Sequence, residues 1–307
     1  MKVKQIDVTE DMKISELISQ FDESGVLGAG RVSRACNILA DMISDEDMNV
    51  FMSLGGPLIP GGMRNIVTKM IREGHVGLIV SSGANITHDL VEAFGGGHYQ
   101  HEGKDDEDLN AEGIGRIADI NVGSDDFTIF EEEITKIFEK IASEKSRLSI
   151  QELLREIGLL VEDENSFVAC AARNDVPIFA PGLIDSMMGL QLWIFSQDHD
   201  FVVDAVADMH YLSDIVFESE KVGAILLGGG LTKHYTLASN VIKGGLDSAI
   251  QITMDRPEAG SLGGAPLEEA KSWAKAKCGS NLASVVGDVT IIFPLIYAAA
   301  LDKIRGD

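Results

Sequence analysis

The chain has 307 residues, of which 45% are hydrophobic, and a formal net charge of -24. This composition excludes a disordered or fibrous protein, and the negative charge argues against a nucleic-acid partner because phosphate backbones would be repelled. The longest apolar runs, 222–227 and 290–300, are shorter than the ~20 residues that a membrane span needs, so no membrane segment is expected.

The first 13 residues lack the apolar core of a signal peptide. Cys36, Cys170 and Cys278 lie far apart and form no C-x-x-C pair, which is typical of a reduced protein without a structural metal site. We therefore expect a cytoplasmic protein that holds no metal. Its negative field would attract cationic ligands such as polyamines.

Helical and strand patterns alternate along the first third of the chain. Apolar residues recur at helical spacing in 11–23, 25–47 and 62–74. The apolar stretches 49–56 and 76–85 end in glycines or small polar residues and predict buried strands.

The middle of the chain begins with a segment rich in His, Gly and Asp, residues 98–126, which predicts a long surface loop with some strand. Its histidines, His98 and His101, lack metal-ligand spacing and are expected at the surface. Strong amphipathic patterns then predict two helices at 127–145 and 149–161.

The alternation of strands and helices resumes after residue 175. Strands are predicted at 176–182, 222–230, 248–254 and 284–294, and helices at 186–197 and 267–277. This pattern predicts an α/β fold with a mostly parallel sheet covered by helices on both faces. Because no Pro-rich or Ser-rich linker interrupts it, a single large domain over residues 1–307 is the simplest interpretation.

Open parallel sheets bind ligands beyond the carboxyl ends of their strands. Glycines with hydroxyl, amide or carboxylate neighbours occupy these ends at 53–57, 81–85, 180–185, 228–230 and 287–289. Glycine lets a ligand approach the backbone, and polar side chains can bond phosphate or ribose, so the set favours a nucleotide.

A Gly-x-Gly sequence at Gly28 and Gly30 imitates a dinucleotide-binding fingerprint. Ser33 stands at the third glycine, and the preceding residues have a helical pattern where the fingerprint requires a strand. We therefore do not expect the cofactor there.

The segment 260–277 is a glycine-rich loop followed by a predicted helix. Glu269 and Trp273 are four residues apart and share a helical face, whereas Lys275 lies about 120° from Glu269 on an ideal wheel. The three residues share a site only if the lysine reaches across or the helix ends nearby. Periodicity by itself does not distinguish Lys275 from Lys271 or Lys277.

Several motifs, in this order and spacing, resemble the deoxyhypusine synthase family over most of the chain. They are Val80-Ser-Ser-Gly83, Asn174-Asp-Val-Pro-Ile-Phe-Ala-Pro-Gly-Leu-Ile-Asp185, Gly228-Gly-Gly-Leu-Thr-Lys-His234, the Gly-Gly-Leu-Asp of 244–247, the segment from Gly260 to Lys275, and Gly287-Asp-Val-Thr-Ile-Ile-Phe-Pro-Leu295. The resemblance implies a Rossmann-like fold, a homotetramer with active sites at a dimer interface, and NAD as cofactor.

The resemblance also assigns roles to residues. Its covalent lysine falls on Lys275 and its substrate histidine on His234, and its neighbouring tryptophan and glutamate fall on Trp273 and Glu269. Its NAD contacts fall on Ser81, Ser82, Gly83, Asp185, Gly260, Ser261 and Asp288.

The implied reaction moves an aminobutyl group from spermidine to a lysine of a small translation factor. A hydride passes from the carbon beside the secondary amine to NAD, and Lys275 then displaces the diamine fragment to form a Schiff base. Lys275 must be neutral when it attacks. His234 is expected to shuttle protons, Trp273 to hold the cationic chain against its ring, and Glu269 to pair with an ammonium.

Some positions depart from the family pattern. Leu190 and Leu262 stand where the family commonly has aspartates for the polyamine, and Ala259, Thr87 and Pro57 replace a further aspartate, a glutamate and an asparagine. Burying an ammonium without carboxylates costs several kcal/mol. Compensating carboxylates would have to come from Asp89, Asp255 or Glu258.

Two alternatives therefore stay open. One is aminoalkyl transfer with another polyamine donor or a small-amine acceptor, as in homospermidine synthases. The other is a non-catalytic homologue that binds NAD or a partner, against which the presence of Lys275, Trp273, Glu269 and His234 argues.

Overall fold

The computed structural model of the chain describes residues 2–306. The chain divides into two compact units, one of Met1–Gly55, His75–Val80 and Tyr211–Asp307, the other of Gly56–Gly74 and Ser81–His210. Helix α10 (Asp208–Glu218) carries the chain from the second unit into the first. This division does not decide whether residues 1–307 fold as one domain, so the single domain stays a prediction.

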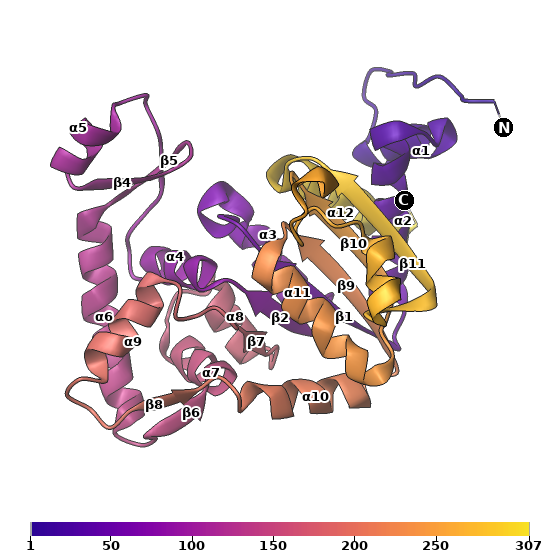
Figure 1. Cartoon of the computed structure of the whole chain (residues 1–307). Helices are drawn as coiled ribbons and strands as arrows, with labels where there is room; N and C mark the ends of the chain where they lie inside the picture. The colour runs from indigo at the N-terminus through magenta and orange to yellow at the C-terminus, as the bar shows by residue number, and fades with distance from the viewer. Residues whose placement is uncertain (1, 307) are drawn as a thin grey trace. The chain divides into compact units, whose positions relative to one another are not determined.

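The first unit is built on a mostly parallel sheet (Figure 1). Its strands follow the order β11-β10-β9-β1-β2, with bounds Ala276–Val286, Leu246–Thr253, Lys221–Leu227, Met48–Leu54 and Leu78–Ser81. Strands β1 and β9 pair in parallel from Met48↔Lys221 to Leu54↔Leu227, and β10 is parallel to both β9 and β11. The central strands are almost wholly buried, as their continuous apolar runs predict.

Helices cover both faces of this sheet. Helix α11 (Gly230–Ser239) packs on β1 and β9, whereas α2 (Leu27–Ser44) and α12 (Val289–Arg305) pack on the other face, with α1 (Ile14–Ser24) against them (Figure 1). The predicted α/β class is confirmed. Gly28 and Gly30 lie in the first turns of α2 with no strand before them, as the helical pattern predicted.

Two predicted elements near the C-terminus are wrong. The helix expected at 267–277 is a 3₁₀ helix, Leu267–Trp273, which ends because Ala276 pairs with Leu246 at the start of β11. The strand expected at 284–294 stops at Val286, and α12 begins at Val289 with Asp288 as its N-cap. This apolar run has no clear period, so strand and helix could not be told apart from the sequence.

The second unit is mainly helical, and the predicted helices in 62–74, 127–145 and 149–161 are present. Its helices are α3 (Arg64–Arg72), α4 (Gly83–Ala93), α5 (Asp106–Ala111), α6 (Ser124–Ala142), α7 (Ile150–Leu160), α8 (Phe167–Arg173) and α9 (Met187–Phe195), after a π-helical turn at Ile59–Met63. Its short strands are β3 (Tyr99–Gln100), β4 (Ile114–Ile117), β5 (Ile120–Gly123), β6 (Arg147–Ser149), β7 (Ile178–Phe179) and β8 (Val202–Asp204). Strands β3 and β4 flank β5, and β6 pairs with β8.

Arg64 and Asp89 form a buried ion pair inside the second unit. Arg64 Nε donates to Asp89 Oδ1 over 2.6 Å, and Arg64 Nη2 donates to Asp163 over 2.8 Å. The Asp89 carboxylate is fully buried and also accepts hydrogen bonds from Ser166 Oγ and two backbone amides of α8. Asp89 is therefore a structural carboxylate, and the idea that it replaces a missing polyamine ligand is wrong.

The structure also bears on membrane crossing. None of the helices in residues 2–306 combines the length and the apolar character that crossing a bilayer requires.

Candidate active site

One cavity of the first unit brings together the four residues predicted for catalysis and substrate binding. It has a volume of about 270 Å³ and lies between α11, the loop at 262–266 and the 3₁₀ helix Leu267–Trp273. Its lining consists of Lys233, His234, Leu237, Leu262, Ala265, Pro266, Glu269, Ala270, Trp273 and Lys275. The cavity is thus lined by all four predicted residues, Lys275, His234, Glu269 and Trp273.

A sharp backbone turn brings Lys275 into this cavity. Ala274 has a left-handed backbone with φ 54°, and Lys275 N donates to Ala270 O over 2.9 Å. The turn places Lys275 Nζ 5.5 Å from the centre of the Trp273 ring, within the range of a cation–π contact. The early end of the helix therefore removes the 120° mismatch of an ideal wheel.

The neighbouring lysines are placed differently. Lys277 Nζ donates to Asp247 Oδ1 over 2.7 Å, and Lys271 is exposed outside the cavity lining. Lys275 is half-buried and lines the cavity. The tertiary fold thus distinguishes three lysines that the sequence pattern leaves equivalent.

His234 lies on α11, one residue after Lys233. Partial desolvation of the imidazole, and after it the positive charge of Lys275, lower the pKa of His234 below its ordinary value. A histidine that stays neutral near pH 7 can both accept and donate a proton, which suits a proton shuttle.

Sequence reasoning missed one member of the cavity, Lys233. Its side chain is 2% exposed, and Nζ donates to the backbone oxygens of Leu262 and Ala265 over 2.9 and 2.6 Å. Burial lowers the pKa of Lys233 to about 8. The only signal in the sequence was its place beside His234 in the Gly228–His234 motif.

The predicted cofactor residues of the second unit surround the start of α4. Ser82 is the N-cap of α4, where its Oγ accepts from Asn85 N over 3.3 Å, and Ser81 precedes it as a buried residue. A Cβ on Gly83 would come within 2.6 Å of Ser186 Oγ. Only glycine therefore allows the turn that contains exposed Asp185 to lie this close to the start of α4.

The predicted cofactor residues of the first unit lie in two loops. Gly260 has φ 64° and follows the 3₁₀ turn Pro257–Ala259, and Ser261 Oγ accepts from Gly264 N over 3.4 Å. Asp288 caps α12 by accepting from Thr290 N over 2.7 Å. Whether these residues meet those of the second unit around one ligand stays a prediction.

The positions that depart from the family pattern have definite surroundings. Leu262 lines the cavity, and Glu269 is the only carboxylate among the cavity residues named above. Thr87 is buried, where Oγ1 donates to Gly83 O and accepts from Met188 N. Leu190 lies in α9 of the second unit and is exposed.

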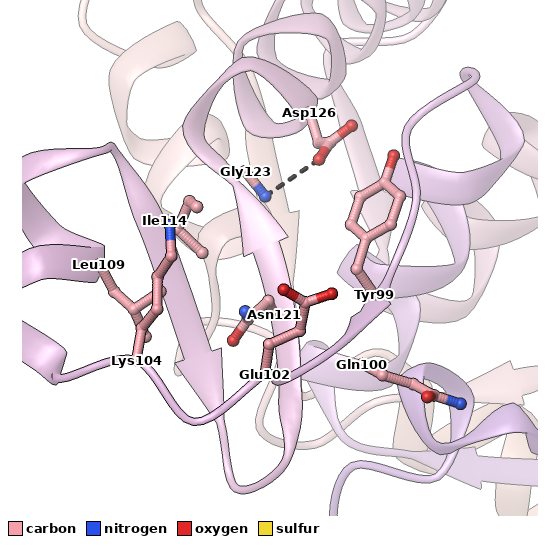
Figure 2. Close-up of a pocket in the computed structure, with 9 residues that line it drawn as sticks. All are labelled: Tyr99, Gln100, Glu102, Lys104, Leu109, Ile114, Asn121, Gly123 and Asp126. Atoms are coloured by element: carbon pink, nitrogen blue, oxygen red, sulfur yellow. Dashed lines mark hydrogen bonds between the residues drawn. The ribbon is translucent and has the colours of Figure 1, made fainter.

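A second cavity, of about 280 Å³, lies in the second unit near the β3-β5-β4 sheet. Figure 2 shows its lining, which includes Tyr99, Glu102, Asn121 and Asp126. The Asp126 carboxylate has a structural partner, because its Oδ2 accepts a hydrogen bond from Gly123 N over 3.0 Å. None of the predicted site residues lines this cavity, so it is not the candidate active site.

The expectation that the histidines near residue 98 lie at the surface is wrong for His98. His98 Nδ1 bonds Glu92 Oε1 over 2.7 Å, and its Nε2 bonds Nδ1 of buried His88 over 2.8 Å. In residues 2–306, no three His, Cys, Asp or Glu side chains are grouped as metal ligands would be. His88, on α4, instead packs against His98 and against Phe127, whose ring centre lies 6.0 Å from that of His88.

We expect His88 to make the protein less stable in acid. Burial, and after it the positive charge that His98 can carry, lower the pKa of His88 to about 4 from 6.5, while Glu92 raises it. Below pH 6.5 His88 is protonated in the unfolded chain but stays neutral in the folded chain until the pH approaches 4. The free energy of unfolding therefore falls as the pH drops. Between pH 7 and pH 5 the loss in unfolding free energy from this residue is roughly 2 kcal/mol.

Urea unfolding of the wild type and His88→Gln at both pH values measures this effect. The variant is expected to lose roughly 2 kcal/mol less than the wild type over the same interval. Replacing exposed His210 by Gln is the control and should leave the pH dependence unchanged. Equal losses in the wild type and His88→Gln would contradict the prediction.

Comparison with known proteins gives one consistent result. A sequence model of the deoxyhypusine synthase family matches residues 16–300. A probable deoxyhypusine synthase of Methanothermobacter thermautotrophicus is 57% identical over 304 residues, covering 99% of both chains, and one of Methanopyrus kandleri is 42% identical with the same coverage. A crystal structure of a candidate deoxyhypusine synthase from Entamoeba histolytica shares the fold, with a TM-score of 0.69 at 18% identity over 97% of this chain and 96% of that one.

Proposed function

This chain belongs to the deoxyhypusine synthase family, and from that premise we propose that it transfers an aminobutyl group from spermidine to a lysine of a translation factor, with NAD as cofactor and a Schiff base on Lys275. The observation that carries the proposal is the cavity in which Lys275 lies over Trp273, beside Glu269 and His234.

Each cavity residue has a task in this reaction. Neutral Lys275 Nζ attacks the oxidised carbon of the donor and forms a bond to it, while the bond from that carbon to the diamine fragment breaks. His234 can take the proton released by the attacking amine and give it to the leaving one. The face of Trp273 and the carboxylate of Glu269 hold the cationic donor chain in place.

Features in each unit fit NAD. Ser81, Ser82 and Gly83 lie at the N-terminus of α4, and the start of a helix suits a phosphate group. The buried hydroxyl of Ser53, at the end of β1, has no partner in the described chain. The residues proposed to hold the cofactor are Ser81, Ser82, Gly83, Asp185, Gly260, Ser261 and Asp288. NAD would supply the hydride acceptor that oxidises the donor carbon and returns the hydride after transfer.

The donor is the least constrained part of the proposal. Spermidine is a multiply charged amine, and the cavity lining offers it one carboxylate, Glu269, among residues that include the apolar Leu262. This observation favours, as a second candidate, a related aminoalkyl transfer that uses another polyamine donor or a small-amine acceptor. The grouping of Lys275, His234, Glu269 and Trp273 in one cavity supports catalysis over a purely binding role.

Trapping of the covalent intermediate tests the proposal. The protein is incubated with NAD and labelled spermidine, reduced with borohydride and digested. The mass of the peptide that contains Lys275 is then measured by mass spectrometry. We expect an added aminobutyl mass on Lys275 together with release of diaminopropane. An adduct that forms only with another amine supports the second candidate, and no adduct with any amine and no diaminopropane overturns both.

The proposal extends to assembly and location. Large apolar side chains are exposed on α9 and just before it, namely Ile184, Leu190, Trp193 and Ile194, which supports a subunit contact in a homotetramer. Three free cysteines, two of them buried, fit a reducing cytoplasm. The partners are then a polyamine and an acceptor protein, and the net charge of -24 argues against nucleic acid.

A further inference from the structure

The cavity near the β3-β5-β4 sheet, shown in Figure 2, lies on one face of that sheet. Tyr99 pairs with Asn121, and Ile114 pairs with Gly123, across neighbouring antiparallel strands. Directly paired residues point to the same face of a sheet, so these four lining residues share one face. Val122, between Asn121 and Gly123 in β5, points to the opposite face and is 3% exposed. The cavity therefore lies on the face away from this buried side chain.

Helix α5 and strand β4 build the apolar part of the cavity. Leu109 of α5 is 2% exposed and lines the cavity together with Ile114 of β4, on which α5 packs. Gly123, opposite Ile114, adds no side chain, which leaves space on this face of the sheet. Figure 2 shows Leu109 and Ile114 at one side of the cavity, and Tyr99 with the Glu102 carboxylate at the other. The cavity, of about 280 Å³, thus has an apolar side and a polar side.

The polar side presents groups whose bonding capacity is unused within residues 2–306. Neither the Glu102 carboxylate nor the Tyr99 hydroxyl forms a hydrogen bond or ion pair with another residue of that range. The backbone bond to Asp126 uses Oδ2, which leaves Oδ1. The basic residue of the lining, Lys104, donates to both carboxylate oxygens of Glu112, over 2.8 and 2.6 Å. Its amine is therefore bonded outside the cavity lining and pairs with neither carboxylate of the cavity.

These groups match the chemistry of a primary ammonium on an alkyl chain. A carboxylate accepts strong, charge-assisted hydrogen bonds from an ammonium, and the face of a tyrosine ring attracts a cation. The methylene groups next to the ammonium would then contact apolar Leu109 and Ile114. An anion would be repelled by Glu102 and Asp126, and an uncharged apolar ligand would cover these carboxylates without bonding them.

We propose that this cavity binds the primary ammonium end of a linear alkylamine, with the ammonium held by Glu102 and the Tyr99 ring and its methylene groups against Leu109 and Ile114. The site is separate from the cavity of Lys275, because none of the residues that line one lines the other. It does not depend on the aminobutyl transfer proposed above. A free diamine and a lysine side chain of a bound protein both carry this group.

The test follows one methyl group in the cavity. The full chain is labelled at the δ1-methyl groups of isoleucine, the Ile114 signal is assigned with Ile114→Val, and methyl NMR spectra are recorded during titration with diaminobutane. Ile225, buried in β9, is the internal reference. Butanediol has the same carbon chain without charge, and Nα-acetyl-lysine methylamide presents the ammonium as a protein side chain would.

We expect the Ile114 signal to shift saturably with diaminobutane but not with butanediol, while the Ile225 signal stays in place. Glu102→Gln should raise the Kd about five- to ten-fold because the charge-assisted bond is lost, and Tyr99→Leu about two- to five-fold because the ring face is lost. Glu107→Gln removes the same charge from an exposed residue of α5 outside the lining, and should change the Kd by less than about two-fold.

Three results would overturn the proposal: an Ile114 signal that does not move, an equal response to butanediol, or a loss of affinity as large in Glu107→Gln as in Glu102→Gln. The last would show a diffuse attraction of cations to the acidic surface. Tighter binding of the lysine derivative would identify a protein side chain as the source of the ammonium, and tighter binding of diaminobutane a free amine. Failure of the aminobutyl transfer would appear in the adduct experiment and leave these results unchanged.

Discussion

Replacing Lys275 by arginine is expected to abolish the covalent adduct and to lower product formation by at least about a thousand-fold. Arginine keeps the positive charge and much of the length of lysine, so the contact with Trp273 can survive. Its guanidinium does not lose a proton in proteins, so it cannot attack the oxidised carbon. Mass analysis after borohydride reduction and an assay of diaminopropane release measure the two effects.

The matched control for this change is Lys271→Arg. Lys271 precedes Lys275 by four residues but is exposed outside the cavity lining, so activity should remain within about two-fold. Thermal unfolding of both variants should match the wild type. An adduct found on Lys271, Lys277 or Lys233, or one that persists in Lys275→Arg, would contradict the assignment of the nucleophile.

Replacing Arg64 by methionine is expected to lower the free energy of unfolding by about 3–5 kcal/mol at pH 7. The change leaves the carboxylate of Asp89 buried without its cation, because Arg64 Nε lies 2.6 Å from Asp89 Oδ1. Burial raises the pKa of Asp89 and Arg64 opposes that rise. Without Arg64 the carboxylate can take up a proton more easily, so the destabilisation should shrink as the pH falls toward 5.

Urea unfolding at pH 7 and pH 5 measures both parts of this prediction. Lys145→Met breaks a surface pair with Glu156, whose nitrogen and oxygen are 2.6 Å apart, and should cost less than about 1 kcal/mol. A loss no larger for Arg64→Met than for Lys145→Met would show that the backbone amides of α8 alone stabilise the buried carboxylate.

The sequence by itself determined the parts of this protein that depend on local pattern. Continuous apolar runs such as 222–227 identified strands buried on both faces, and their alternation with amphipathic helices identified the α/β class. The spacing of several motifs identified the family, and with it Lys275, Trp273, Glu269 and His234 as candidate residues. Each of these signals is a short stretch of sequence, or the order in which such stretches follow one another along the chain.

Only the tertiary structure decided how Lys275 enters the cavity. Pairing of Ala276 with Leu246, thirty residues earlier, ends the predicted helix and forces Ala274 into a left-handed turn. Burial of Lys233 and Asp89 was likewise invisible, because each is enclosed by segments distant in sequence, the 262–265 loop and α8. Helical periodicity reports only which residues share a face, whereas long-range pairing determines where a helix stops and which charges lose contact with water.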